Sequence, residues 1–419
     1  MGKDEVIGTN PYAYLPESNA QPNAFMTDYL HKTKVGFDEL PFTPVDSLVL
    51  SSLSYFDFDV YAYGDVHGGN FVPVIDILRF TPLESMLSSG WLRKAEELPD
   101  FLTALARSRR FADLRVGFFA NETAAVIEKQ FCACTFRVGD KDNTPIAYLA
   151  FRGTDGSLAG WKEDFNLSYM PTIPSQKTAT AYMSGVLSAL PTDMPIYAGG
   201  HSKGGNLAEF AALTIDEGGY QRIHRIFNHD GPSFLDAPSP RIDTAEFKAK
   251  LDKTVPESSV FGMVLESREE FRVVKSDARG FFQHVPFTWV VEGNDFATQT
   301  ELNSGAKMID ATLDRWLRSC TQQEREVFID TIYELLTSDD VKSWADFQNG
   351  FMSNMAAFMR DGRKLDEGTK EIIGQTIRNL GGVAGAALHE RFGTITQRVR
   401  KAAPFTNSSD EKAANNEQE

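Results

Sequence analysis

The chain has 419 residues, of which 42% are hydrophobic and 24% are charged, and it is long enough for one large globular domain with a smaller addition. Its 58 acidic residues outnumber its 42 basic residues, and the formal net charge of -16 opposes binding to a nucleic-acid backbone or to an anionic membrane surface. A small neutral substrate fits this composition better than either of these partners.

The cysteine content and the N-terminus indicate the compartment. Cys132, Cys134 and Cys320 form neither a metal-binding pair nor a disulfide framework, which favours a reducing environment. The first residues lack the apolar segment of a signal peptide, and nowhere do about 18 uncharged apolar residues run together. We therefore expect a cytoplasmic protein without a membrane-inserted segment. The sequence does not indicate an oligomeric state.

The predicted elements begin with an arm. Residues 1–40 are rich in Asn, Pro and polar side chains, have little periodicity, and are expected to lie over a domain. The run PVDSLVLSSLSYFDF then brings apolar residues at helical spacing and opens the predicted α/β domain, residues 41–300. Two strands follow in QFCACTFRVG and PIAYLAF, and on the first of them Cys132 and Cys134 share one face as small core residues.

Strands and helices alternate in the middle of the chain. The pattern predicts a helix in SQKTATAYMSGVLSAL, a buried strand in MPIYAGG and another helix in KGGNLAEFAALTI. Further strands are expected in IHRIFNHDGP, in SSVFGMVL (residues 258–265) and in FRVVKS. Strands that alternate with helices of this length imply the α/β fold class, with a mostly parallel central sheet covered on both faces.

The strand pattern stops after about residue 300. Consecutive amphipathic helices are expected within residues 301–400, one of them opened by a capping box at Thr321 and Glu324. They form a C-terminal helical appendage whose role the residues do not define. The tail, residues 401–419, is polar and poor in aromatic residues, and we expect it to be disordered.

The stretch YAGGHSKGGNLAEFAAL carries the clearest functional signal. Gly200, Ser202 and Gly204 form the pattern G-x-S-x-G between a predicted strand and a predicted helix. In such an elbow the strained backbone presents the serine hydroxyl at the carboxyl edge of the sheet, and glycines flank the serine because a Cβ would clash. The pattern predicts Ser202 as a nucleophile. The alternative interpretation is a glycine-rich turn with an incidental serine.

A serine hydroxyl needs a base to take its proton and a carboxylate to orient that base, and with this elbow the chain order is serine, acid, histidine. His284 fits the base because it lies in a loop just after the last predicted strand, although an ordinary surface or core histidine remains the alternative. The other histidines beyond Ser202 fit less well, since His224 opens a strand, His229 is expected in a turn and His389 lies in a late helix.

Two aspartates compete for the role of the acid. Asp230 ends a predicted strand and precedes a Gly-Pro pair that turns the chain at the edge where catalytic groups gather. Asp277 lies seven residues before His284 among basic residues, where it is otherwise a solvated loop charge. We favour Asp230, whose alternative role is to cap the turn that follows it.

Acyl transfer also needs backbone N–H groups directed at the developing oxyanion. Lys203 follows the nucleophile and supplies one such amide. Thr154 supplies the second candidate amide in YLAFRGTDGS, because that strand leads into a helix rather than a hairpin; otherwise it is an ordinary strand exit. This chemistry needs no metal and no organic cofactor.

Several stretches resemble, in the same order, the Mbeg1-like family, a branch similar to the lipase class 3 group of α/β hydrolases: PVDSLVLSSLSYFDF, FRGTD, GGHSKGGNLAEFAA, FNHDGPSF, SSVFGMV and QHVPFTW. The resemblance covers residues 41 to about 300 and implies the α/β-hydrolase fold. It also implies Ser202 as nucleophile, His284 as base, and the amides of Thr154 and Lys203 as oxyanion donors.

The resemblance further implies that Trp161 and Asp164 brace the oxyanion loop. The sequence departs from class 3 lipases at the acid, because their DPVP stretch is replaced by GMVL near Gly262, which makes Asp230, one strand earlier, the substitute. The segment in the place of the lipase lid is short, so the resemblance does not imply interfacial activation.

Together these expectations describe a serine hydrolase that cleaves carboxylic esters through an acyl-enzyme, with a small-molecule ester or lipid-like substrate. Ser202 attacks, His284 relays the proton and Asp230 orients His284. Two alternatives stay open: a catalytically inactive binding protein that kept the elbow, and an acyltransferase, thioesterase or peptidase that uses the same triad.

Overall fold

A computed structural model of the chain describes residues 24–87, 97–155, 157–259, 261–263, 265, 269–303, 321–322 and 325–326. All of them belong to one unit of the chain, residues 1–350. The predicted helical appendage, including Glu324 and Cys320, lies almost entirely outside the described residues, and the predicted tail lies wholly outside them.

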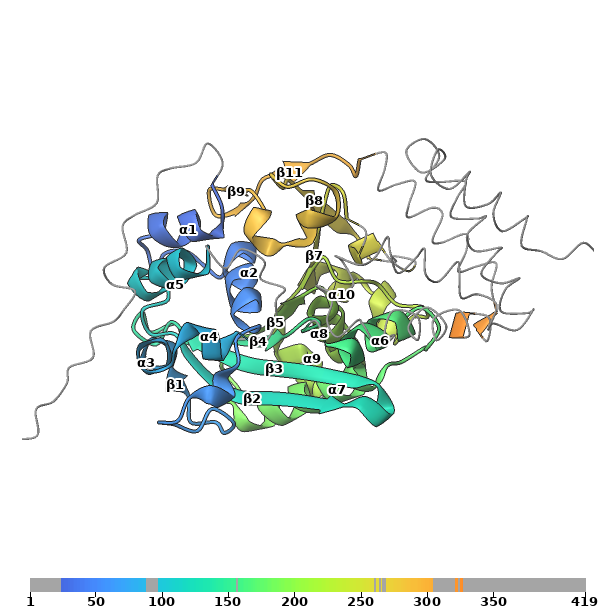
Figure 1. The fold of residues 1–419 in the computed structure, drawn as a ribbon, viewed down its shortest axis with the longest axis horizontal. Coiled ribbons are helices and arrows are strands. Elements are labelled where there is room, and N and C mark those ends of the chain that lie inside the picture. The colour runs from blue at the N-terminus through green and yellow to red at the C-terminus, as the bar shows by residue number, and fades with distance from the viewer. Residues whose placement is uncertain are drawn as a thin grey trace, which may run out of the picture. The chain divides into compact units, whose positions relative to one another are not determined.

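A nine-stranded sheet forms the centre of the fold, in the order β1-β2-β3-β4-β5-β6-β7-β8-β11 (Figure 1). Its strands are β1 (Val72–Pro73), β2 (Arg115–Ala124), β3 (Lys129–Val138), β4 (Ile146–Phe151), β5 (Ile196–His201), β6 (Ile223–His229), β7 (Leu251–Pro256), β8 (Phe271–Val274) and β11 (Thr298–Gln299). Strands β4 to β8 run parallel to one another, and antiparallel strands extend the sheet at both edges. The predicted parallel sheet is therefore present as its central part.

Helices cover both faces of this sheet, and two apolar clusters mark the two sides. On one face, α7 (Pro174–Ala189) and α8 (Lys203–Thr214) pack against alternate side chains of β3 to β6. On the other face lie α1 (Met26–Lys32), α2 (Pro44–Leu53) and α5 (Leu98–Arg107), together with the buried free thiols of Cys132 and Cys134. Because both faces are covered, all of β4 is buried, as expected for a central parallel strand.

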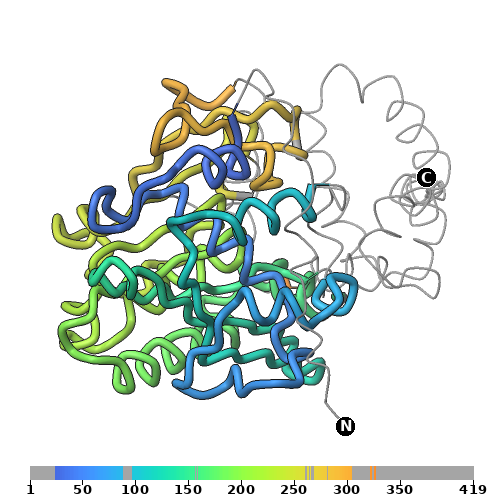
Figure 2. Tube along the Cα trace, turned by 90° about the vertical axis from the view of Figure 1, so that its left-hand side faces the viewer, coloured from blue at the N-terminus to red at the C-terminus, as the bar shows by residue number. Residues whose placement is uncertain are grey.

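The remaining elements complete the described part of the chain. They are α3 (Val74–Phe80), α4 (Leu83–Met86), α6 (Leu158–Asn166), α9 (Glu217–Arg222), α10 (Ala245–Lys250) and the hairpin of β9 (Val291–Glu292) with β10 (Asp295–Phe296), besides short 3-10 turns. The N-terminal segment runs beside this hairpin in both views, where Ala24 bridges to Val291 (Figures 1 and 2). Within the described ranges, no helix has the length and apolarity that a bilayer span requires.

One predicted strand is in the wrong place. The sequence predicts a strand over residues 258–265, whereas the strand is β7, just before that stretch, and Phe261–Met263 form a 3-10 turn. The strand β7 is hard to recognise in the sequence because it contains two charged residues, Asp252 and Lys253. Both are buried in ion pairs with side chains of other segments. A pattern that counts charged residues as exposed cannot recognise such a strand.

Candidate active site

Ser202 occupies a strained turn between β5 and α8. Its backbone angles are φ 58° and ψ -133°, a region that residues with a Cβ adopt at a cost and that clusters at functional sites. Ser202 is partly exposed, whereas His201 and Lys203 on either side of it are buried. The turn thus brings a hydroxyl to the surface at the carboxyl end of a central strand.

The elbow glycines are required by the close approach of the end of β4. A Cβ built on Gly200 would lie 2.3 Å from the carbonyl carbon of Gly204 and 2.4 Å from the carbonyl oxygen of Phe151. A Cβ built on Gly204 would lie 2.0 Å from the same oxygen of Phe151. All three distances are shorter than real Cβ atoms show, so no larger residue fits at either position without moving the backbone.

The next parallel strand delivers Asp230 beside the elbow. The N–H of Ser202 donates to the carbonyl oxygen of His229, the last residue of β6, at 2.9 Å. Asp230 follows directly, has φ 55°, and donates its own N–H to the carbonyl oxygen of Thr254 on β7 at 2.8 Å. The carboxyl ends of three adjacent strands therefore place the serine and the aspartate at one edge of the sheet.

His284 is in direct contact with Asp230. It ends the 3-10 helix Gly280–His284, and its Nδ1 lies 2.6 Å from Oδ2 of Asp230, with both side chains buried. The other carboxylate oxygen accepts the N–H of Gly262 at 3.1 Å and the hydroxyl of Ser259. Since a carboxylate can only accept, Nδ1 of a neutral His284 carries the proton and Nε2 is its basic nitrogen.

The structure separates the two aspartates that the sequence leaves in competition. Asp277 is exposed on the loop that follows β8, and its N–H donates to the carbonyl oxygen of Thr288 at 3.0 Å. Asp230 is the one that contacts His284. The ring of His284 lies beside the elbow, because its centroid is 4.5 Å from the ring centroid of His201, the residue before Ser202.

The other histidines have different surroundings. His224 is the second residue of β6 and is exposed. His229 is the last residue of β6 and does not lie in a turn. Its ring is held by the hydroxyls of Ser47 and Thr254, both at 2.9 Å. Burial lowers the pKa of His229 to about 3, so its imidazole is neutral at ordinary pH. His389 lies outside the described residues.

The predicted oxyanion loop leaves β4 next to Ser202. A Cβ built on Gly153 would lie 3.2 Å from the Cβ of Ser202, which shows how closely this loop approaches the elbow. Thr154 is buried, and its hydroxyl donates to Oδ2 of Asp164 on α6 at 2.5 Å. Burial raises the pKa of Asp164 to about 6, against the opposing effects of the Lys203 charge and of this hydrogen bond.

The side chain of Lys203 has a role that the sequence did not indicate. It is buried, and its Nζ donates to the carbonyl oxygen of Gln130 at 3.1 Å, to the amide oxygen of the same residue at 2.9 Å and to Oε2 of Glu163 at 3.2 Å. Oδ1 of Asp164 lies 3.7 Å away. The lysine thereby joins α8 to β3 and α6, while its own amide is one of the N–H groups that a helix N-terminus leaves unbonded within the helix. Trp161, the other predicted brace, is buried in α6.

Replacing Lys203 with methionine is expected to lower the free energy of unfolding by about 3–5 kcal/mol, because it leaves the buried carboxylate of Glu163 without its cation. Urea denaturation followed by circular dichroism measures the loss. Adding Glu163→Gln should recover much of it, and Lys248→Met, at an exposed lysine, provides the matched control. An unchanged denaturation midpoint for Lys203→Met would show that the ion pair of Lys203 with Glu163 does not stabilise the fold.

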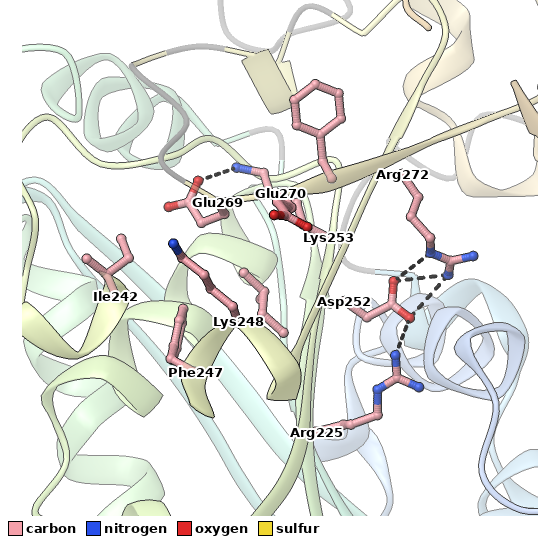
Figure 3. A pocket seen from close by; sticks show the side chains of 11 residues that line it. Arg225, Ile242, Phe247, Lys248, Asp252, Lys253, Glu269, Glu270 and Arg272 are labelled. Atoms are coloured by element: carbon pink, nitrogen blue, oxygen red, sulfur yellow. Dashed lines mark hydrogen bonds and ion pairs between the residues drawn. The ribbon is translucent and has the colours of Figure 1, made fainter. Parts of the chain in front are cut away.

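A charged pocket of about 200 Å³ lies elsewhere in the fold. Figure 3 shows Asp252 between Arg225 and Arg272, with Lys253 against Glu269. These basic and acidic residues stand near the starts of β6, β7 and β8, whereas Ser202 follows the end of β5. The pocket is therefore at the opposite edge of the parallel strands, and we do not assign it to the site.

Comparison with known proteins assigns the chain to a family. The model of the Mbeg1-like family matches residues 105–334, which is more than half of the chain and includes the elbow, Asp230 and His284. Neither the curated proteins nor the solved structures yielded a match. The extent of the family match shows that the chain belongs to the Mbeg1-like family.

Proposed function

We propose that the protein is a serine hydrolase of the α/β-hydrolase fold that cleaves carboxylic esters through an acyl-enzyme. The observation that carries this proposal is the contact of His284 with Asp230 at the sheet edge where Ser202 leaves its strand. The chain order of serine, acid and histidine is the order of α/β hydrolases. The parallel strands β4 to β8, with the elbow after β5, are the scaffold that this fold uses.

The proposed reaction follows from the groups present. Oγ of Ser202 attacks the ester carbonyl carbon while Nε2 of His284 takes the hydroxyl proton, and Asp230 stabilises the imidazolium that forms. The amides of Thr154 and Lys203 bind the oxyanion, and each such donor contributes about 10²–10³ in rate. His284 then protonates the leaving alcohol, and a water molecule, deprotonated by the same histidine, releases the acid and restores Ser202.

An alkyl fluorophosphonate tests whether Ser202 is activated, because such reagents phosphonylate serines that an adjacent base deprotonates. We expect the native protein to gain one covalent adduct, which peptide mapping places on Ser202, and the heat-unfolded protein to gain none. Native protein without an adduct, or with the adduct on another residue, would contradict the proposal. Labelling of Ser202 without cleavage of any p-nitrophenyl ester of graded chain length would refute ester hydrolysis while leaving an activated serine.

A further inference from the structure

The imidazole of His201, directly before the nucleophile, is held at both ring nitrogens. Its Nε2 lies 2.7 Å from the backbone carbonyl oxygen of His284, and its Nδ1 lies 3.0 Å from the hydroxyl of Tyr55. His201 and Tyr55 are both buried. His201 is therefore bonded to the loop that carries the proposed base, although the two residues are 83 positions apart in the chain.

The direction of these hydrogen bonds is set by chemistry. Burial holds the pKa of His201 well below its ordinary value, so its ring is neutral and has a single N–H. A carbonyl oxygen can only accept, which places that hydrogen on Nε2 of His201 and leaves Nδ1 to accept the hydroxyl hydrogen of Tyr55. With both nitrogens engaged, His201 is not available as the base for Ser202.

Tyr55 connects His201 to the oxyanion loop through a close contact with Gly153. Its hydroxyl oxygen lies against the backbone of Gly153, because a Cβ built on Gly153 would lie 2.2 Å from that oxygen. Tyr55 follows α2, in a part of the chain that precedes the family match at residues 105–334. A residue that follows an N-terminal helix thus completes a connection between two parts of the proposed site.

We propose that Tyr55 and His201 are positioning residues: through them Gly153 of the oxyanion loop is linked to the carbonyl of His284, which fixes the base loop relative to the oxyanion loop. The consequence of this link for catalysis rests on the proposed function. Asp230 holds the ring of His284 and His201 holds its backbone, so the two contacts together determine where Nε2 points. A displacement of about 1 Å at such a group costs about 10²-fold in rate.

Two amide substitutions at the same position separate this role from simple packing. In His201→Gln the side-chain amide nitrogen reaches the place of Nε2 and can still donate to His284. In His201→Asn the amide ends near the place of Nδ1 and cannot reach that carbonyl. We expect His201→Asn to lower kcat for a p-nitrophenyl ester, and the rate of fluorophosphonate labelling, by about 10²-fold with KM little changed, and His201→Gln to lose less than about tenfold.

Equal rates for the two variants, or a His201→Asn variant as fast as the wild type, would overturn the proposal. If His201→Asn does not fold, Tyr55→Phe takes its place. We expect Tyr55→Phe to lower kcat by about tenfold, a smaller loss because His201 keeps its hydrogen bond to His284. An unchanged kcat would show that Tyr55 is not a positioning residue.

A measurement that needs no activity distinguishes this inference from the proposed function. Nitrogen-15 NMR of the histidine side chains, in the Ser202→Ala protein at neutral pH, should show His201 as the neutral tautomer with the hydrogen on Nε2. A hydrogen on Nδ1 would overturn the hydrogen-bond chain. Absence of labelling and of ester cleavage in the wild type would instead refute the hydrolase. The tautomer of His201 would still decide whether the hydrogen bonds from Tyr55 through His201 to His284 exist.

Discussion

Replacing Ser202 with alanine is expected to lower kcat for ester hydrolysis by about 10⁶-fold, because the substitution removes the atom that forms the acyl-enzyme. The protein should stay folded, since the hydroxyl of a partly exposed residue is lost and the buried neighbours of the elbow are unchanged. Initial rates with a p-nitrophenyl ester measure the loss, and the thermal unfolding midpoint, followed by circular dichroism, checks the fold.

Ser188 provides the matched control for this substitution. It is exposed on α7, and among the described residues its hydroxyl bonds only within its own helix, to the carbonyl oxygen of Ser184 at 2.8 Å. Ser188→Ala should therefore keep the wild-type rate. A Ser202→Ala protein that is stable and within tenfold of wild-type activity would assign the chemistry to another nucleophile.

The positions of Ser202, Asp230 and His284 could be predicted from the sequence because each residue comes after a strand whose pattern is local. Ser202 follows MPIYAGG, Asp230 follows IHRIFNH, and His284 comes after FRVVKS. Parallel strands bring their carboxyl ends to one edge, so the order of strands and turns was enough to predict that these residues gather there.

What the sequence did not indicate depends on partners far away in the chain. Lys203 looks like an exposed lysine until Glu163 and Gln130 surround it, and Tyr55 gains its role only through His201. Strand β2 also escapes a pattern search, because a β-bulge interrupts its alternation where Phe118 has a positive φ.

Replacing Asp230 with asparagine is expected to lower kcat by about 10⁴-fold with little change in KM. The amide keeps the shape of the carboxylate, but it can present an N–H to Nδ1 of His284, which moves the imidazole hydrogen to Nε2 and removes the basic nitrogen that Ser202 needs. It also removes the negative charge that stabilises the imidazolium. Steady-state kinetics with the same ester separate the effect on kcat from any effect on KM.

Asp277→Asn is the control that the chain itself offers, because Asp277 is the other aspartate near His284 in sequence and is exposed. It should change kcat by less than about threefold, as expected for an exposed loop charge screened by water. If Asp277→Asn were the variant that lost activity, the acid would belong to the loop of the base, and the 2.6 Å contact of His284 with Asp230 would have only a structural role. If both variants kept full activity, no carboxylate would orient His284, and a serine activated by histidine alone would have to explain the rate.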